Sequence, residues 1–432
     1  MKIKVVRKPY SEVLSMNRGK HIVPKRPNMF FRTLMRLVSI PDLSATHFKY
    51  KDIGMERLGK KEPCLVLMNH SSFIDLEIAA TVMYPRPFNI ISTTDGFIGK
   101  NWLMRQIGCI PTKKFVNDPT LLGDMRYAVE KLKSSVVLFP EAGYSFDGTS
   151  TTLPDTLGRC VKYLGVPLVM IKTYGAFSRD PLYNNLQRRK VNVSATREYL
   201  LSREEIREKS ADEIQQLIEK QFAFDSFAWQ RDNNVKIDEP FRADGLNRVL
   251  YKCPDCLTEG QMLGEGTTVF CRACGKKHTL DEYGVLHAED GETRFSHVPD
   301  WYRWQRECVR QEIENGDYSV DIPVDVFMGI DTKCLYDVSC GRLTHTVNGF
   351  RLTGAEGELD YIQKPLSSYS LNSDFFWYEI GDVIGIGNNR ELYYCFPRVK
   401  DDVVTKIRLA AEEIYKLVYE RKRSRRVAAA ES

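Results

Sequence analysis

The chain has 432 residues, of which 43% are hydrophobic and 28% charged, the composition of a globular protein with about two to four domains. The net charge of +5 is too small to indicate a nucleic-acid-binding protein. Eleven cysteines, in a chain that opens without an apolar leader, predict a reducing compartment, so we expect a cytoplasmic protein. No stretch reaches the roughly 18 apolar residues that a membrane-spanning helix needs.

Residues 1–49 are expected to form an N-terminal segment with one amphipathic helix, at 28–40. Arg32 and Arg36 interrupt its apolar residues, so it is too short and too charged to span a membrane. Two interpretations stay open. The helix lies in an anionic membrane surface with its arginines reaching the headgroups, or it docks on its own domain. The first predicts a peripheral protein on the inner face of the cell membrane.

Residues 50–229 alternate apolar runs with helical patterns, which predicts an α/β domain with a mixed sheet flanked by helices. Asp118 and Pro119 are expected to open one helix, and Gly165 to close another. Two capping boxes, Ser202 with Glu205 and Ser210 with Glu213, predict helices that end the domain near residue 227. The expected strands are 64–68, 87–93, 108–114, 135–140 and 166–172.

The segment "CLVLMNHSSFID" (64–75) is the strongest candidate for a catalytic site in this domain. A buried strand would end just before His70, at the edge of the sheet where α/β proteins bind ligands. His70 and Asp75 can meet only if the chain turns between them, with Ser72 as the N-cap of a following helix. The alternative is structural, because Ser72 and Asp75 also have the spacing of a helix capping pair.

Four blocks in this domain resemble the motifs of the lysophosphatidate and glycerol-phosphate acyltransferases. "NHSSFID" (69–75) resembles the Asn-His-x-Ser-x-x-Asp signature of that family, and "LFPEAGYS" (138–145) resembles its Phe-Pro-Glu-Gly-Thr-Arg-Ser block. "GCIPTKK" (108–114) and "VPLVMI" (166–171) stand where the family has its Gly-x-Ile-x-x-x-Arg and Val-Pro-Ile-Val-Pro-Val blocks. The resemblance covers about residues 30–225.

The resemblance implies an O-acyltransferase of phospholipid biosynthesis. The enzyme would move a fatty acyl group from a thioester of coenzyme A or of acyl-carrier protein to a lysophospholipid or glycerol-phosphate hydroxyl. His70 would be the general base and Asp75 would orient it, because a hydroxyl is a poor nucleophile until a base takes its proton. The implied substrate-binding residues are Asn69, Ser72, Lys113, Lys114, Glu141, Ala142, Gly143, Tyr144 and Ser145.

Several of these positions depart from the family pattern. Lys114 and Tyr144 stand where the family has arginines, and Ala142 replaces a glycine. A lysine binds phosphate as a point charge and lacks the two-bond grip of arginine. The acyl-transfer residues are therefore kept while the phosphate-binding residues are altered. Two alternatives stay open: an acyltransferase acting on a lipid hydroxyl without phosphate, and a catalytically degenerate scaffold that binds acyl chains.

Residues 246–290 resemble a zinc ribbon. Two Cys-x-x-Cys pairs offer four thiolates and no open position, so the spacing predicts a structural Zn²⁺ site. His278 is expected to be an exposed neighbour of the site. Acidic residues surround it, so we expect no nucleic-acid partner. The four predicted ligands are Cys253, Cys256, Cys271 and Cys274.

Residues 318–421 combine short strand-like runs with a final helix at 401–421. This order resembles a pleckstrin-homology or GRAM-like domain, a bent sheet closed by a C-terminal helix. Its ligand stays open between lipid headgroups and proteins, and a purely structural role is also possible. The basic tail, 422–432, is either a solvated helix end or a further contact with anionic lipid.

Overall fold

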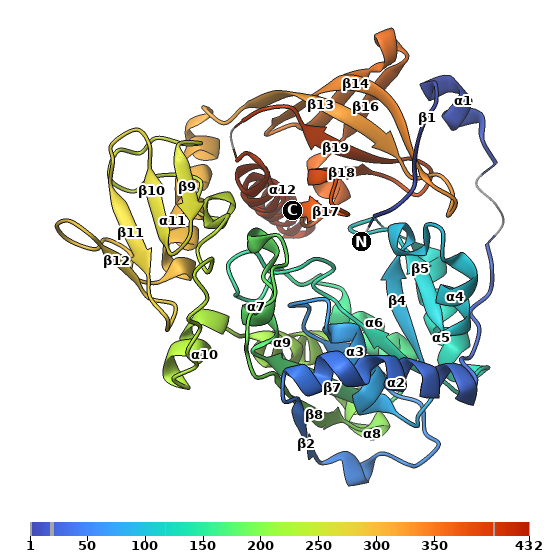
Figure 1. Cartoon of the computed structure of the whole chain (residues 1–432). Helices are drawn as coiled ribbons and strands as arrows, with labels where there is room; N and C mark the ends of the chain where they lie inside the picture. The colour runs from blue at the N-terminus through green and yellow to red at the C-terminus, as the bar shows by residue number, and fades with distance from the viewer. Residues whose placement is uncertain (1, 18–20, 117, 401, 432) are drawn as a thin grey trace.

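The computed structural model describes residues 2–17, 21–116, 118–400 and 402–431. In this part of the chain, strands form three sheets in three neighbouring units (Figure 1). An α/β domain comes first, a small four-stranded sheet lies at one side, and a larger C-terminal sheet packs against the α/β domain. No helix among the described residues combines the length and the apolar composition that a membrane crossing requires.

The sheet of the α/β domain has the order β2-β8-β7-β3-β6-β4-β5. Strands β7 and β8 pair antiparallel and the other neighbours pair parallel, which confirms a mixed sheet. Its central strand β3 is completely buried, as its continuous apolar sequence predicts. The strands are β2 (Lys49–Ile53), β3 (Leu65–Met68), β4 (Phe88–Thr93), β5 (Cys109–Thr112), β6 (Ser135–Leu138), β7 (Leu168–Tyr174) and β8 (Ser194–Leu201).

The helices of this domain begin and end largely where local signals place them. Asp118 caps α5 by accepting a hydrogen bond from the Thr120 amide, and Gly165 closes α6 in the left-handed conformation. Both predicted capping boxes are present, at the starts of α8 and α9. The helices are α3 (Asp75–Met83), α4 (Asn101–Gln106), α5 (Pro119–Glu130), α6 (Leu157–Leu164), α7 (Ala176–Arg179), α8 (Arg203–Glu208), α9 (Ala211–Phe222) and α10 (Ser226–Asp232).

The small sheet is antiparallel, in the order β12-β11-β10-β9. After it comes α11 (Val298–Asn315), a long helix that the sequence analysis did not anticipate. His278 is buried beside the ring of Trp301 on this helix, so the expectation of an exposed histidine is wrong. The strands are β9 (Met262–Glu265), β10 (Thr268–Cys271), β11 (Lys277–Leu280) and β12 (Leu286–Ala288).

The C-terminal sheet follows the order β16-β15-β14-β13-β19-β18-β17, two antiparallel meanders joined by the pairing of β13 with β19. The N-terminal strand β1 (Val5–Arg7) pairs parallel with β14. The start of the predicted N-terminal segment, 1–49, therefore joins the C-terminal sheet. The strands are β13 (Val320–Met328), β14 (Leu335–Thr346), β15 (Gly349–Gly354), β16 (Leu359–Gln363), β17 (Asn372–Trp377), β18 (Gly381–Gly387) and β19 (Leu392–Pro397).

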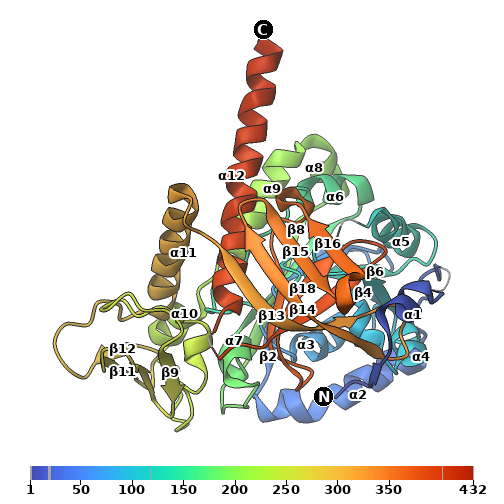
Figure 2. The same ribbon diagram turned by 90° about the horizontal axis from the view of Figure 1, so that it is seen from above.

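The last helix, α12 (Val404–Glu431), is longer than the predicted 401–421. Its first half packs beside α11 and the C-terminal sheet, while its far end projects away from the molecule (Figure 2). The predicted basic tail is therefore a continuation of this helix up to residue 431. The side chains of 425–432 lie outside the described residues, so a lipid contact through them stays a prediction.

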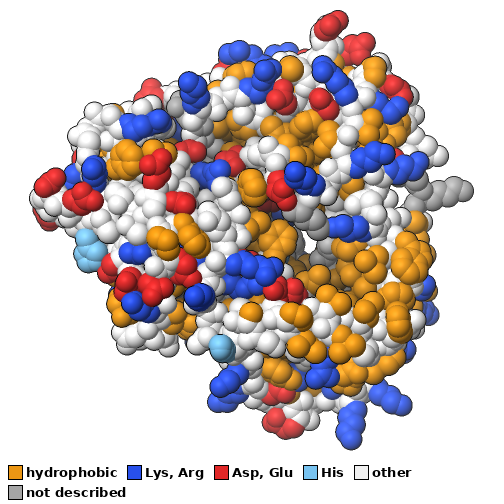
Figure 3. Space-filling model, in the orientation of Figure 1, with side chains coloured by type: hydrophobic (Ala, Val, Ile, Leu, Met, Phe, Trp, Pro, Cys, Tyr) orange, Lys and Arg blue, Asp and Glu red, His pale blue; other side chains and the backbone are white. Residues whose placement is uncertain are grey.

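Helix α2 (Met29–Ala45) lies on the outside of the α/β domain and is apolar on two faces. Leu43, Phe31 and Met35 pack on the domain core, which agrees with a docked helix. The opposite face is exposed, and apolar side chains gather over this region of the surface (Figure 3). The exposed apolar residues of α2 are Met29, Phe30, Leu34, Leu37, Val38 and Ile40.

The arginines of α2 do not extend away from the domain. Arg32 donates a hydrogen bond to the Pro85 carbonyl, and the guanidinium of Arg36 lies 4.5 Å from the centre of the Tyr84 ring. The expectation that both reach toward lipid headgroups is wrong in this conformation, because the Tyr84-Pro85 segment offers them nearer partners.

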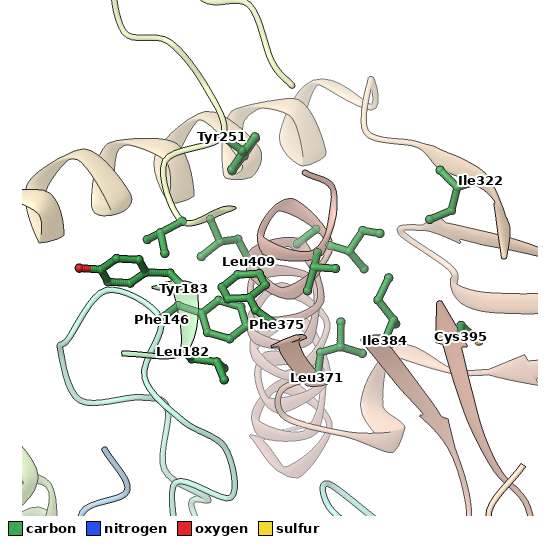
Figure 4. Packing of buried hydrophobic residues seen from close by; sticks show 14 of the residues in the cluster. Phe146, Leu182, Tyr183, Tyr251, Ile322, Leu371, Phe375, Ile384, Cys395 and Leu409 are labelled. Atoms are coloured by element: carbon green, nitrogen blue, oxygen red, sulfur yellow. The ribbon is translucent and has the colours of Figure 1, made fainter. Parts of the chain in front are cut away.

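One hydrophobic core joins the three units. Phe146, Leu182 and Tyr183 of the α/β domain lie in the same cluster as Leu371 and Phe375 of the C-terminal sheet (Figure 4). The cluster continues through Leu409 of α12 into the small sheet. Interfaces this apolar resemble the inside of a domain, so the three units are expected to move as one body.

Candidate active site and metal centre

The candidate active site begins at the carboxyl end of β3. His70 follows this strand, and the chain turns before α3 starts at Asp75. The turn brings the His70 Nδ1 atom within 3.1 Å of Asp75 Oδ2. Because Nδ1 faces the carboxylate, Nε2 is the nitrogen left for a substrate. The contact that the sequence analysis required of this pair is therefore present.

Hydrogen bonds from the backbone fix the position of Asp75. Its Oδ2 atom also accepts hydrogen bonds from the Ser71 and Ser72 amides, at 2.8 and 3.1 Å. The prediction that Ser72 is the N-cap of α3 is wrong, because Ile74 occupies that position. The Ser72 hydroxyl instead donates to Asp180, a buried carboxylate from the end of α7.

Two aromatic rings enclose the His70 imidazole. Its centroid lies 4.4 Å from that of Phe139 and 4.1 Å from that of Tyr144, with the planes tilted by 30° and 32°. Two rings that stack this closely cannot share one face, so both faces of the imidazole are covered. The exposed side chain of Phe73 in turn contacts Tyr144. The arrangement leaves 18% of the His70 side chain exposed and fixes the plane of its ring.

Glu141 holds the backbone on which His70 sits. One carboxylate oxygen accepts a hydrogen bond from the His70 amide and the other from the Thr151 amide, both at 2.8 Å. The side chain is 3% exposed, and burial raises its pKa to about 7. The structure thus gives Glu141 a supporting position beneath the histidine. The contact with the acceptor that the resemblance implied stays a prediction.

We expect Glu141→Gln to destabilise the protein. A glutamine has one oxygen and one NH₂ group, so it can accept from only one of the two amides and leaves the other unpaired. An unsatisfied buried donor costs about 1–3 kcal/mol. Thermal melting of the variant, beside Glu204→Gln on the exposed surface of α8, measures the difference; equal melting temperatures would contradict this role.

The same variant tests the raised pKa. Above its ordinary value of 4.5, the carboxyl of Glu141 stays protonated in the folded chain until about pH 7. The folded state therefore binds more protons in this window, and the contribution of Glu141 to stability is lost as the pH rises through it. The stability difference between wild type and Glu141→Gln should shrink from about pH 5 to pH 8. A difference that stays constant from pH 5 to pH 8 would show that the carboxylate is charged throughout.

Comparison with known proteins bears on this domain. Residues 49–172 match the family model described as Acyltransferase. The chain carries an acyltransferase domain. This match indicates that the protein is an O-acyltransferase enzyme. No curated protein matches the chain at a significant level.

Five chains of solved structures match the protein. One is the 1-acyl-sn-glycerophosphate (LPA) acyltransferase PlsC from Thermotoga maritima, with 17% sequence identity and a TM-score of 0.31. The alignment covers 44% of this chain and 78% of that one.

Several other predicted site residues form hydrogen bonds that hold the backbone of the acyltransferase domain in place. The Asn69 side chain accepts a hydrogen bond from the Thr173 amide at 2.8 Å, which ties the end of β3 to β7. Ser145 donates to the Thr149 carbonyl at 2.6 Å. Ala142, which replaces the family's glycine, has a φ of 55°. This left-handed conformation is one that glycine adopts more readily than alanine. Gly143 donates its amide to the Glu141 carbonyl at 2.7 Å.

The two lysines predicted to bind phosphate are engaged with the C-terminal sheet. Lys113 donates to the backbone carbonyls of Asn388 and Asn389. Lys114 forms an ion pair with Asp374, at 3.1 Å. Sequence reasoning missed Asp374, Asp180 and Phe139 as parts of the site. Phe139 stood within a quoted motif, whereas the two aspartates carry no local pattern that could have indicated them.

The four predicted zinc ligands are brought together beside the small sheet. Their sulfur atoms all lie within 4.8 Å of one another, and both Cys253 to Cys274 and Cys256 to Cys271 measure 3.7 Å. Four thiolates at about 2.3 Å from a tetrahedral zinc would be roughly 3.8 Å apart. The donor set therefore fits Zn²⁺. A site of four thiolates leaves no position for a substrate, which suits a structural ion.

Proposed function

We propose that this enzyme transfers a fatty acyl group from a thioester donor to a lipid hydroxyl, with His70 as the general base. The contact of His70 Nδ1 with the buried carboxylate of Asp75 is the observation that carries the proposal. The donor is a thioester of coenzyme A or of acyl-carrier protein. The acceptors typical of the resembled family are lysophospholipids and glycerol phosphate.

The reaction follows from the position of the imidazole. Nε2 takes the hydroxyl proton while the acceptor oxygen attacks the thioester carbonyl, and the tetrahedral intermediate then expels the donor's thiolate, which receives that proton. Asp75 stabilises the imidazolium formed between these steps. The Phe139 and Tyr144 rings stabilise the same cation through their π faces. No covalent acyl-enzyme is needed, because the acceptor itself is the nucleophile.

An acceptor-dependent assay tests the proposal. The purified chain is incubated with a labelled acyl thioester and a panel of single-chain lipids, and both thiol release and acylated product are measured. We expect thiol release to require an acceptor. Thiol release at the same rate without any acceptor would indicate a thioesterase, and acyl binding without turnover would favour the degenerate scaffold.

We propose that the exposed face of α2 attaches the enzyme to a membrane surface. Other exposed apolar side chains extend this face, since Trp102 of α4 contacts Phe31, and Arg105 of α4 binds the carbonyls of Ile22 and Val23. Such a contiguous apolar surface is typical of a binding site. Insertion of this face into a membrane would bring the enzyme to the layer that contains its lipid substrate.

Charged substitutions on this face should weaken binding to vesicles. Burying one large apolar side chain is worth about 1.5–3 kcal/mol, so Phe30→Asp with Val38→Asp should lower partitioning at least tenfold. Sedimentation with phosphatidylcholine vesicles, with and without phosphatidylglycerol, measures the loss. Ile362→Asp, at an exposed position of β16, is the control and should bind like wild type. Equal sedimentation of all three proteins would exclude this face.

The C-terminal unit is proposed to be pleckstrin-homology-like. Its seven strands form two antiparallel meanders, β13 to β16 and β17 to β19, which are joined where β13 pairs with β19, and α12 follows the last strand. Arg408 of α12 donates to the Tyr144 carbonyl, so this helix supports the residue that stacks on His70. We therefore assign this unit a structural role, which is to support the active site.

A further inference from the structure

The ion pair between Lys114 and Asp374 lies where the family's phosphate-binding arginine would stand. Asp374 belongs to β17 of the C-terminal sheet, 260 residues further along the chain. The side chains are only 11% and 6% exposed. A carboxylate from a second unit therefore neutralises the cation that was expected to hold the acceptor's phosphate.

This carboxylate is a fixed part of the site. Close to it, the ring of Phe375 stacks on Phe146 of the acyltransferase domain, with centroids 4.2 Å apart. The hydroxyl of Tyr369 donates to the Pro140 carbonyl, and the ring of the same residue contacts Phe115. The contact of Phe375 with Phe146 belongs to an apolar interface of the kind that holds two units together (Figure 4). Opening it to release Lys114 would expose buried aromatic rings to water.

A phosphate monoester does not fit this arrangement. It carries about −1.5 to −2 charges at neutral pH and would meet Asp374 as a like charge. Taking Lys114 for itself would also leave Asp374 buried without its partner, and an uncompensated buried charge strongly disfavours binding. The family's second arginine is Tyr144 here, and Lys113 already binds backbone carbonyls. The Lys114–Asp374 pair therefore carries no net charge at the position where the family has its arginine.

We infer that Asp374 determines acceptor specificity, and that the acceptor is a single-chain lipid without a phosphate monoester. This inference rests on the proposed acyl transfer and names its substrate class. A lipid with a neutral or zwitterionic head group presents its hydroxyl to His70 without approaching Asp374 as an anion. Asp374 would then exclude the acceptors that the resembled family uses.

The test compares acceptors that share one acyl chain and differ only in the head group. Initial rates are measured for the full chain with one acyl thioester and with 1-acylglycerol, lysophosphatidylcholine or 1-acylglycerol 3-phosphate. We expect wild type to have a kcat/KM at least tenfold higher for one of the first two than for the phosphate monoester. Asp374→Asn keeps the shape of the side chain and removes its charge, so it should raise the relative kcat/KM for the monoester at least tenfold.

Two further variants separate specificity from damage to the fold. Lys114→Met with Asp374→Leu replaces the pair by apolar side chains, and it should not gain the monoester, because it removes the ammonium together with the carboxylate. Asp360→Asn removes an exposed carboxylate from the same sheet and should change neither rate. A wild-type preference for the monoester, or an unchanged preference in Asp374→Asn, would overturn the inference and leave acyl transfer standing. Wild type without transfer to any lipid would overturn the proposed function itself.

Discussion

Replacing His70 by alanine should lower kcat/KM for acyl transfer by about 10²–10⁴-fold, the usual contribution of a general base. The imidazole is the group that contacts Asp75 through Nδ1, and an alanine offers no nitrogen to take the proton. The fold should survive, because the His70 amide, which Glu141 holds, is unchanged in the variant. Thiol release with an acceptor present measures the loss, and thermal melting verifies the fold.

Asp75→Asn should be less damaging than His70→Ala. Three N–H donors converge on Asp75 Oδ2, so an asparagine would place its oxygen there and keep the orientation of the imidazole. What it loses is the negative charge that stabilises the imidazolium. His287→Ala, an exposed histidine paired with Asp281, serves as the control and should keep full activity. Near wild-type turnover by His70→Ala would refute the mechanism.

Removing the metal should produce the second large effect. We expect one zinc ion per chain, and chelation or Cys253→Ser with Cys271→Ser should destabilise the small sheet by several kcal/mol, since structural zinc contributes folding energy directly. The loss should spread to the C-terminal helix. Glu259, which precedes β9 of the small sheet, binds Lys406 of α12 at 2.7 Å, and Arg408 on the same helix supports Tyr144.

Elemental analysis and thermal melting of protein purified without added metal test whether zinc is bound and whether it stabilises the fold. Cys340→Ser, an exposed cysteine of the C-terminal sheet, should keep its zinc and its melting temperature within error. Activity should fall together with the metal content if the support of Tyr144 is lost. A metal-free protein whose melting curve does not respond to a chelator would contradict the prediction.

Features that depend on neighbouring residues could be predicted from the sequence alone. The buried strand before His70, the turn to Asp75, the capping boxes of α8 and α9 and the two cysteine pairs follow from spacing within one turn or one knuckle. Local geometry has few solutions, so a short pattern is enough to predict it. Even here Ser72 was misassigned, because the distant Asp180 offered its hydroxyl a better partner than the helix terminus.

The way in which the ends of the chain complete the site depends on tertiary packing. The pairing of β1 with β14, the approach of Arg408 to Tyr144 and the contact of Asp374 with Lys114 join residues that are hundreds of positions apart. No periodicity or spacing links such residues, since they meet only after separate units bury a shared apolar core. The sequence therefore located the residues proposed for acyl transfer, while the charge at the predicted phosphate-binding lysine was decided by the packing of a second unit against it.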